Sequence, residues 1–257
     1  MGSDAPTRRP DPWCPMTDEF AHLAALHTLE GVTVPPLVLE LSAGGQPDLE
    51  WRNELGGLTF RVREGYLKWN PRTTGIDLER ERRRLAWLAG RHPVPRVLRY
   101  GEDDDAQWLL TAPVPGTSAV GDAWRARRPE AIRAIADGLR AIHALPVENV
   151  PAAFTAESWV GRTPSSLGPR PPIGRPVVVH GDACAPNTLV GPDGAWTGHV
   201  DLGDLASGDR WADLAVASLS LDWNYGEGHQ QELFDAYGIA PDETRIRWYR
   251  ALWELES

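Results

Sequence analysis

Apolar and polar residues alternate along two neighbouring stretches in the first half of the chain. LTFRV (58–62) and YLKW (66–69) both follow a period of two, and Arg-Glu-Gly separates them. This pattern predicts an antiparallel hairpin. We expect strands with turns over residues 31–41 and 47–69, and two more strands within residues 94–116. The acidic run from Glu102 to Asp105 would form the solvated turn between those two strands.

A change to helical spacing follows the hairpin. In residues 76–90, Leu85 and Leu88 mark an apolar face together with Leu78. Thr74 and Asp77 supply an N-terminal capping signature, and Gly90 is a typical residue at a helix end. The spacing therefore predicts one helix between the two pairs of strands.

The second half of the chain is mostly helical in pattern. Residues 129–145 carry Pro129 in the first turn and one apolar stripe, which predicts a helix. Three further helices are expected over residues 209–223, 227–239 and 241–257. Residues 146–176 are rich in Pro, Gly and Ser, and apart from 152–160 they read as a loop or a reduced cap. His143 reads as a helix-end residue.

This order of elements predicts an α+β protein with two lobes. Residues 19–112 would form a small β-rich N-terminal lobe, and residues 113–257 a larger, mainly helical C-terminal lobe. Residues 1–18 read as a disordered leader without an apolar signal core, and Met16 is a candidate for the natural start.

Composition narrows the class of protein. No apolar run approaches the length of a membrane span, so we expect no membrane insertion. Only Cys14 and Cys184 occur, which favours a reducing compartment, the cytoplasm. Residues 201–257 hold 12 acidic residues against 4 arginines, within a net charge of −10. This balance argues against nucleic acid and fits a cationic small molecule, although a solvated acidic surface would look the same.

Residues of the types that bind metal ions and phosphate are concentrated between Val177 and Leu214. Two short apolar strands are predicted there, and each runs into a loop that carries carboxylates. Asp182 and Asn187 lie five residues apart in the first loop, and Asp201 opens the second loop as Asp-Leu-Gly. Carboxylate and amide oxygens are the ligands that Mg²⁺ and a phosphoryl group require.

Lys68 lies in the middle of an apolar strand, where a charge is costly unless it has a partner. It could point to water from an edge strand. Glu81, on the helix that follows, is the partner we expect, and Glu79 is also available.

At this point the motifs resemble a known family. HGDACAPN (180–187) matches a His-x-Asp-x-x-x-x-Asn catalytic loop, VDLG (200–203) matches the following Asp-x-Gly segment, and ASGDRWADLA (206–215) is typical of antibiotic kinases. Together they resemble the aminoglycoside phosphotransferase family, nearest the 3′-type kanamycin and neomycin enzymes. The resemblance spans most of the chain from Asn53 onward and implies a protein-kinase-like fold.

The resemblance implies a donor site for ATP and Mg²⁺. Asp182 would accept a hydrogen bond from the substrate hydroxyl, and Asn187 and Asp201 would bind Mg²⁺. Lys68, held by Glu81, would grip the α- and β-phosphates.

The adenine ring would lie against Tyr66, near backbone groups of Ala112 and Val114. The turn that contains Gly56 and Gly57 would fold over the phosphates.

Other polar residues of these motifs are expected to be structural. His180 would brace the catalytic loop, Asp209 and Asp213 would cap a helix and brace that loop, and Cys184 would pack.

On the acceptor side the resemblance implies Glu254, with Asp222 and Glu227 as further candidates that could equally be surface residues. Trp253 stands where similar proteins have Asp, and Leu219 where they have Arg. The segment between His143 and His180 is also shorter than is typical, which implies a more open cleft.

We therefore expect an ATP-dependent O-phosphotransferase that acts on an aminoglycoside hydroxyl and gives resistance or self-protection. We expect it to be a monomer or a weak dimer. A cationic peptide antibiotic or an amino-alcohol metabolite is an alternative acceptor. A nucleotide-binding protein without turnover is the alternative from another class, and the complete set of Lys68, Asp182, Asn187 and Asp201 argues against it.

Overall fold

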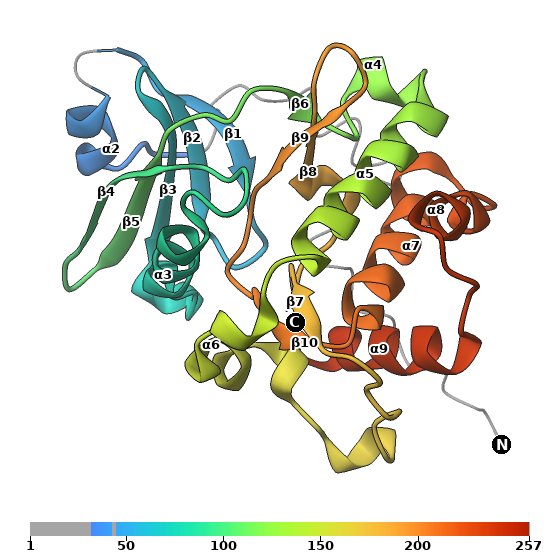
Figure 1. Ribbon diagram of the computed structural model, residues 1–257. Helices are drawn as coiled ribbons and strands as arrows, with labels where there is room; N and C mark the ends of the chain where they lie inside the picture. Colours follow the sequence, from blue (N-terminus) through green and yellow to red (C-terminus); the bar gives the residue numbers. More distant parts are fainter. Residues whose placement is uncertain (1–31, 43–44, 257) are drawn as a thin grey trace, which may run out of the picture.

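A five-stranded antiparallel sheet forms the N-terminal lobe of the computed structural model, which describes residues 32–42 and 45–256 (Figure 1). The strands lie in the order β1-β2-β3-β5-β4, and their bounds are Asp48–Arg52, Leu58–Val62, Gly65–Pro71, Ala106–Thr111 and Val97–Glu102. The leader, with Met16 and Cys14, lies outside the described residues.

The expected hairpin is β2–β3. Val62 pairs with Gly65 at the turn, and Thr59 pairs with Lys68 in the middle of the strands. A side chain at Gly65 would lie 1.9 Å from the Thr111 carbonyl oxygen, so only glycine fits where β3 begins beside β5. The hairpin and the strand pair β4–β5 are confirmed.

The prediction of a strand within residues 31–41 is wrong, because residues 32–35 form no regular element. Pro36–Leu41 forms helix α2, with Val38 fully buried against Phe60 and other apolar residues of β2, β3 and β5. Pro36 occupies the first helical turn, where a missing N–H costs nothing and the fixed φ favours the helix. The apolar composition of this stretch had suggested a strand.

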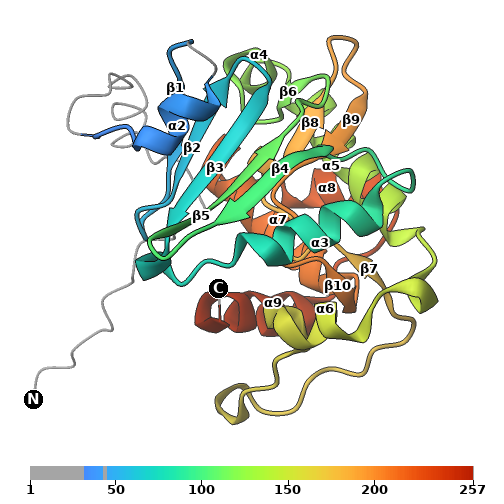
Figure 2. The ribbon, with the colours of Figure 1, turned by 90° about the vertical axis from the view of Figure 1, so that its left-hand side faces the viewer.

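Helix α3 (Leu78–Leu88) lies between the sheet and the second lobe (Figure 2). The Asp77 side chain accepts a hydrogen bond from the Glu79 amide and caps the helix, as predicted. Gly90 adopts φ 74° just beyond the helix end. Leu85 and Leu88 pack with Leu109 of β5 and with residues of the C-terminal lobe, so α3 shares a core with both lobes.

Helices dominate the C-terminal lobe, as expected. The predicted helices appear as α5, α7, α8 and α9, with bounds Arg128–His143, Trp211–Tyr225, Gln230–Tyr237 and Glu243–Glu256. The segment read as a loop or cap holds α6 (Ala152–Glu157) and the short 3₁₀ helices η2 to η4: Val147–Asn149, Trp159–Gly161 and Ser165–Leu167. Short helices that were not predicted also lie outside that segment: α4 (Asp122–Arg125), η1 (Arg72–Thr74) and η5 (Ala185–Asn187). None of the helices in the described part of the chain is long and apolar enough to cross a membrane.

Short strands place the two carboxylate loops. β7 (Val177–Val179) pairs with β10 (Ala206–Gly208), while β8 (Thr188–Val190) pairs with β9 (Trp196–His199) and with β6 (Thr117–Ser118). The loop after β7 ends in η5 (Ala185–Asn187) and leads into β8. β7 and β9, which lead into the carboxylate loops, are the two predicted strands. β6, β8 and β10 were not predicted, because such short segments carry little periodic signal.

Candidate active site

Lys68 on β3 and Glu81 on α3 form an ion pair inside the cleft between the lobes. The Lys68 ammonium donates to both carboxylate oxygens of Glu81, each at 2.8 Å, and it also binds Asp201. Burial by itself lowers the pKa of Lys68, but the carboxylates of Asp201 and Glu81 raise it above its ordinary value. Lys68 therefore stays charged and faces the carboxylate loops.

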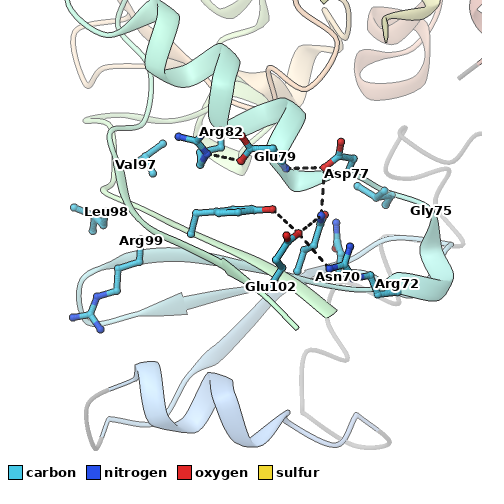
Figure 3. Close-up of a pocket in the computed structure, with 13 residues that line it drawn as sticks. Asn70, Arg72, Gly75, Asp77, Glu79, Arg82, Val97, Leu98, Arg99 and Glu102 are labelled. Carbon is cyan, nitrogen blue, oxygen red and sulfur yellow. Dashed lines mark hydrogen bonds and ion pairs between the residues drawn. The ribbon is translucent and has the colours of Figure 1, made fainter. Parts of the chain in front are cut away.

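Glu79, the other possible partner, points elsewhere. It binds Arg82 through two hydrogen bonds of 2.5 and 2.6 Å, on the side of α3 that borders a separate cavity of about 980 Å³ (Figure 3). The geometry thus assigns Glu81, and not Glu79, to Lys68.

The loop after β7 positions Asp182 and Asn187 together. The Asn187 side-chain amide donates to the Asp182 carboxylate at 2.7 Å and to the Asp182 carbonyl at 3.0 Å. His180 accepts a hydrogen bond from the Asp182 amide at 3.2 Å and donates through Nε2 to the Val200 carbonyl at 3.0 Å. The imidazole is therefore neutral and braces the loop, which agrees with its predicted role.

Asp213 of α7 binds the backbone of this loop. Its carboxylate accepts the backbone amides of His180 and Gly181 at 2.7 and 2.9 Å, and Nε2 of His143 lies 2.9 Å away. His143 in turn contacts the Tyr237 hydroxyl at 2.8 Å. Bracing by Asp213 is confirmed, and His143 is part of it. The role of His143 was missed because its partners are far away in sequence.

Asp201 follows β9 and has a φ of 58°. This value lies in the left-handed region, which residues other than glycine rarely adopt. Such a conformation costs about 1–3 kcal/mol and persists where its surroundings impose it. Here it places the Asp201 carboxylate against Lys68 and near Asp182. Burial first, and then the charge of Asp201, raise the pKa of Asp182 to about 7.

The oxygens that remain fit a divalent cation. Because Asn187 donates through its amide nitrogen, its oxygen stays available, and Asp201 uses only one of its two oxygens on Lys68. In the described residues no three His, Cys, Asp or Glu side chains cluster as a metal site. The donor set is thus two protein oxygens, which suits Mg²⁺ that keeps phosphate and water ligands.

The adenine-side candidates lie where β3, β5 and the connection to the second lobe meet. Tyr66 pairs with Thr111 and is 39% exposed. The Ala112 amide donates to the Arg96 carbonyl at 2.9 Å, so its own carbonyl is the group left for a ligand. The Val114 side chain lies close to Gly198 on β9, beside the same connection.

The turn between β1 and β2 borders the cleft that also contains Lys68. Gly56 has φ 96°, and the Gly57 amide donates to the Asn53 side chain at 2.7 Å. A side chain at Gly57 would lie 2.2 Å from the Asn70 amide oxygen, so this close approach requires glycine. Asn53 and Leu55 of the turn line the cleft.

The acceptor half of the cleft differs from the sequence prediction. A cavity of about 360 Å³ is lined on that side by residues that were not predicted: Glu157, Trp159, Arg162, Asp204, Trp253 and Glu256. The Trp159 indole donates to the Gly181 carbonyl at 2.5 Å, which fixes its ring beside the catalytic loop.

The three predicted acceptor carboxylates do not line this cavity. Asp222 accepts a hydrogen bond from Gln230, and Asp222 and Glu254 both act electrostatically on Arg250. Glu227 lies near Asp222 and helps to raise its pKa, after burial. Helical spacing could have indicated Glu256, because it shares a face with Trp253 three residues earlier, whereas Glu254 is turned by 100°.

Comparison with known proteins supports the motif assignment. Residues 58–164 and 162–249 match the model of the phosphotransferase enzyme family. The chain is 34% identical to an aminoglycoside 3′-phosphotransferase of Streptomyces fradiae, with 72% of this chain and 82% of that protein covered. It is 32% identical to the streptomycin 3′′-kinase of Streptomyces griseus, with 87% and 96% covered.

Solved structures show the same architecture. The aminoglycoside phosphotransferase APH(3′′)-Id from Streptomyces rimosus superposes with a TM-score of 0.61 at 30% identity, covering 93% of this chain and 99% of that one. Its complex with ADP and streptomycin gives a TM-score of 0.62 at 29% identity and the same coverage. The expected two-lobed, kinase-like α+β fold is confirmed.

Proposed function

The chain belongs to the phosphotransferase enzyme family, and we propose that it transfers the terminal phosphoryl group of ATP to a hydroxyl group of an aminoglycoside. The observation that carries this proposal is the convergence of Lys68, Asp182, Asn187 and Asp201 in one cleft. They come from three parts of the fold (β3, the loop after β7 and the loop after β9), and together they can hold a nucleotide and orient an alcohol.

On the donor side, Lys68 neutralises the α- and β-phosphates, and Glu81 keeps its ammonium in place. Asn187 and Asp201 would hold Mg²⁺, which supplies neutralisation of the phosphate charge that develops during transfer. Tyr66 and the backbone of Ala112 and Val114 would hold the adenine, and the turn at Gly56 and Gly57 would cover the phosphates.

On the acceptor side, Asp182 accepts the hydrogen bond of the attacking hydroxyl and takes its proton as the new oxygen–phosphorus bond forms, while the bond from the terminal phosphorus to the bridging oxygen of ATP breaks and ADP leaves. The hydrogen bond from Asn187 orients this carboxylate toward the cleft. Transfer of this kind needs alignment more than covalent help from the protein.

The acceptor half of the cleft offers a carboxylate and aromatic edges. Glu256 offers a charge for an ammonium group, and the exposed edges of the buried Trp159 and Trp253 border the cleft beside it. The alignment with a streptomycin kinase over most of both chains makes streptomycin a first candidate beside the kanamycin and neomycin type. We place the reaction in the cytoplasm, where ATP is available, and expect a monomer or weak dimer to suffice.

The test is a coupled ADP-release assay with MgATP over streptomycin, kanamycin, neomycin, a cationic peptide antibiotic and choline. Turnover with an aminoglycoside, and a product heavier by one phosphate, is the expected result. If only choline or only the peptide supports turnover, that compound would take the place of the aminoglycoside as the proposed acceptor. Tight MgATP binding without turnover on any acceptor would favour a nucleotide-binding protein.

A further inference from the structure

Glu157 ties the end of α6 to three arginines of α3. Arg83 donates to both Glu157 carboxylate oxygens at 2.9 Å, and Arg84 donates to one of them at 3.1 Å. Arg80 donates to the Glu157 carbonyl at 2.8 Å. These contacts cross from the N-terminal to the C-terminal lobe, and Arg80, Arg83 and Arg84 flank Glu81 on its own helix.

Arg84 is fully buried, so its contacts are part of the folded core. Besides Glu157, it donates to the carbonyls of Phe154 and Leu205 at 2.9 and 3.0 Å. Its guanidinium also lies over the Phe154 ring, 4.6 Å from the ring centre. A buried guanidinium with this many fixed partners holds α3 in one position relative to α6.

The two residues after Glu157 contact the loops that carry Asp201 and Asp182. The Ser158 hydroxyl donates to the Asp204 carbonyl at 2.8 Å, three residues beyond Asp201. The Trp159 indole donates to the Gly181 carbonyl beside Asp182. Ser158 and Trp159 are both buried.

From these contacts we propose that Glu157, Ser158 and Trp159 are positioning residues that set α3, the Asp201 loop and the Asp182 loop relative to one another. Consecutive residues of one segment each hold a different part of the site. Glu157 acts on Lys68 through α3 and Glu81, and Trp159 acts on Asp182 through the loop backbone. The inference rests on the proposed function only in that Lys68 binds nucleotide phosphates.

The test is a thermodynamic cycle on nucleotide affinity, measured by calorimetry with MgADP and no acceptor. Glu157→Gln should weaken MgADP binding about fivefold or more in the otherwise unchanged protein. In a Glu81→Gln background the same change should have no further effect, because its action passes through Glu81. A merely structural role would weaken binding equally in both backgrounds, and that result would overturn the proposal.

Glu79→Gln is the matched control. It removes the same charge from an ion pair with an α3 arginine, but that pair lies within α3, on the side shown in Figure 3. MgADP affinity of this variant should stay within about twofold of the unchanged protein. An equal loss in Glu79→Gln would mean that any charge change near α3 has this effect, and would contradict the assignment.

Arg83→Gln repeats the cycle from the other partner and keeps the test informative if Glu157→Gln fails to fold. Its side chain is 34% exposed, so folding should survive its loss. Arg83→Lys should recover part of the affinity. Because no acceptor is present, an enzyme that phosphorylates none of the tested alcohols would still give a readable cycle.

Trp159→Phe tests the second arm by turnover. Phe keeps one aromatic ring but loses the N–H to Gly181 and the volume of the pyrrole ring, and we expect kcat to fall about tenfold or more with little change in the KM for ATP. An unchanged kcat would remove Trp159 from the proposal.

Discussion

Two side chains at the centre of the cleft each use one atom on a protein partner and keep one oxygen for a ligand. Asn187 donates its nitrogen to Asp182 and keeps its oxygen, and Asp201 gives one oxygen to Lys68 and keeps the other. The second carboxylate oxygen of Asp182, Oδ1, is buried, and the Cys184 side chain lies within hydrogen-bonding reach of this carboxylate.

Asp182→Asn separates chemistry from binding. The amide keeps the shape and the burial but can no longer take a proton, so kcat should fall by about 10²–10⁴-fold. Affinity for MgADP, measured by calorimetry, should change little because Lys68 and Asp201 are intact. A parallel loss of nucleotide affinity would show that Asp182 holds the nucleotide instead.

Glu256→Gln and Glu254→Gln form a matched pair on α9. Glu256 lines the cleft and Glu254 does not, so only the first should raise the acceptor KM. We expect the acceptor KM to rise about fivefold in Glu256→Gln, because a partly exposed charge contact is lost. The KM for ATP should stay unchanged in both variants. If Glu254→Gln has the larger effect, the acceptor contacts Glu254, as the motif resemblance implies.

At the scale of elements, close packing explains residues that secondary-structure propensity disfavours. α5 carries Gly138 in its middle, although glycine weakens a helix by about 1 kcal/mol relative to alanine. A side chain there would lie 2.7 Å from both His199 and Trp196 of β9. The helix therefore keeps glycine so that β9 can approach it, and β9 leads into Asp201.

Gly138→Ala should accordingly destabilise the protein. Overpacking of this kind costs about 1–3 kcal/mol, more than the gain in helix propensity. Thermal and urea unfolding should both show the loss. A rise in the unfolding midpoint would mean that β9 can move away freely, which would leave Asp201 less firmly placed than the structure indicates.

At the scale of the whole molecule, the lobes also meet through buried histidines. His92, just after α3, contacts His199 of β9 at 2.9 Å, and the Pro93 carbonyl accepts the His199 amide. The two imidazoles can share this hydrogen bond only while one nitrogen lacks a proton. Burial first, and then nearby His180, lower the pKa of His92 to about 4.

Stability should therefore fall in mild acid. Because the folded pKa of His92 lies below its ordinary value of 6.5, the unfolded chain takes up the proton first. The stabilisation is complete above about pH 6.5 and is lost as the pH falls toward 4, by about 1–3 kcal/mol. Urea unfolding at a series of pH values measures this slope.

The control compares two single substitutions. His92→Asn should be less stable at pH 7 but show a flatter pH dependence between pH 6.5 and 4.5. His229→Asn, before α8 and away from this contact, should keep the slope of the unchanged protein. Identical slopes in all three proteins would mean that other groups carry the acid sensitivity.

Sequence alone determined the fold class, most helices and the residues that converge in the donor half of the cleft. Residues such as Lys68, Asp182, Asn187 and Asp201 stand out because charged or amide groups beside apolar strands need partners, and their order follows a phosphoryl-transfer motif. Local signals also placed the ends of α3, since Asp77 caps it through its immediate neighbours.

Only the tertiary structure decided which groups meet across long sequence separations. It selected Glu81 over Glu79, brought His143 to Asp213, and placed Glu256 rather than Glu254 in the cleft. It also gave a role to Glu157, which lies in a segment that reads as a loop. The physical reason is that helix rotation and side-chain pairing across lobes depend on packing, which local spacing does not encode. The carboxylate loops between Val177 and Leu214 can thus be recognised from the sequence, while only packing shows which residues line the cleft around them.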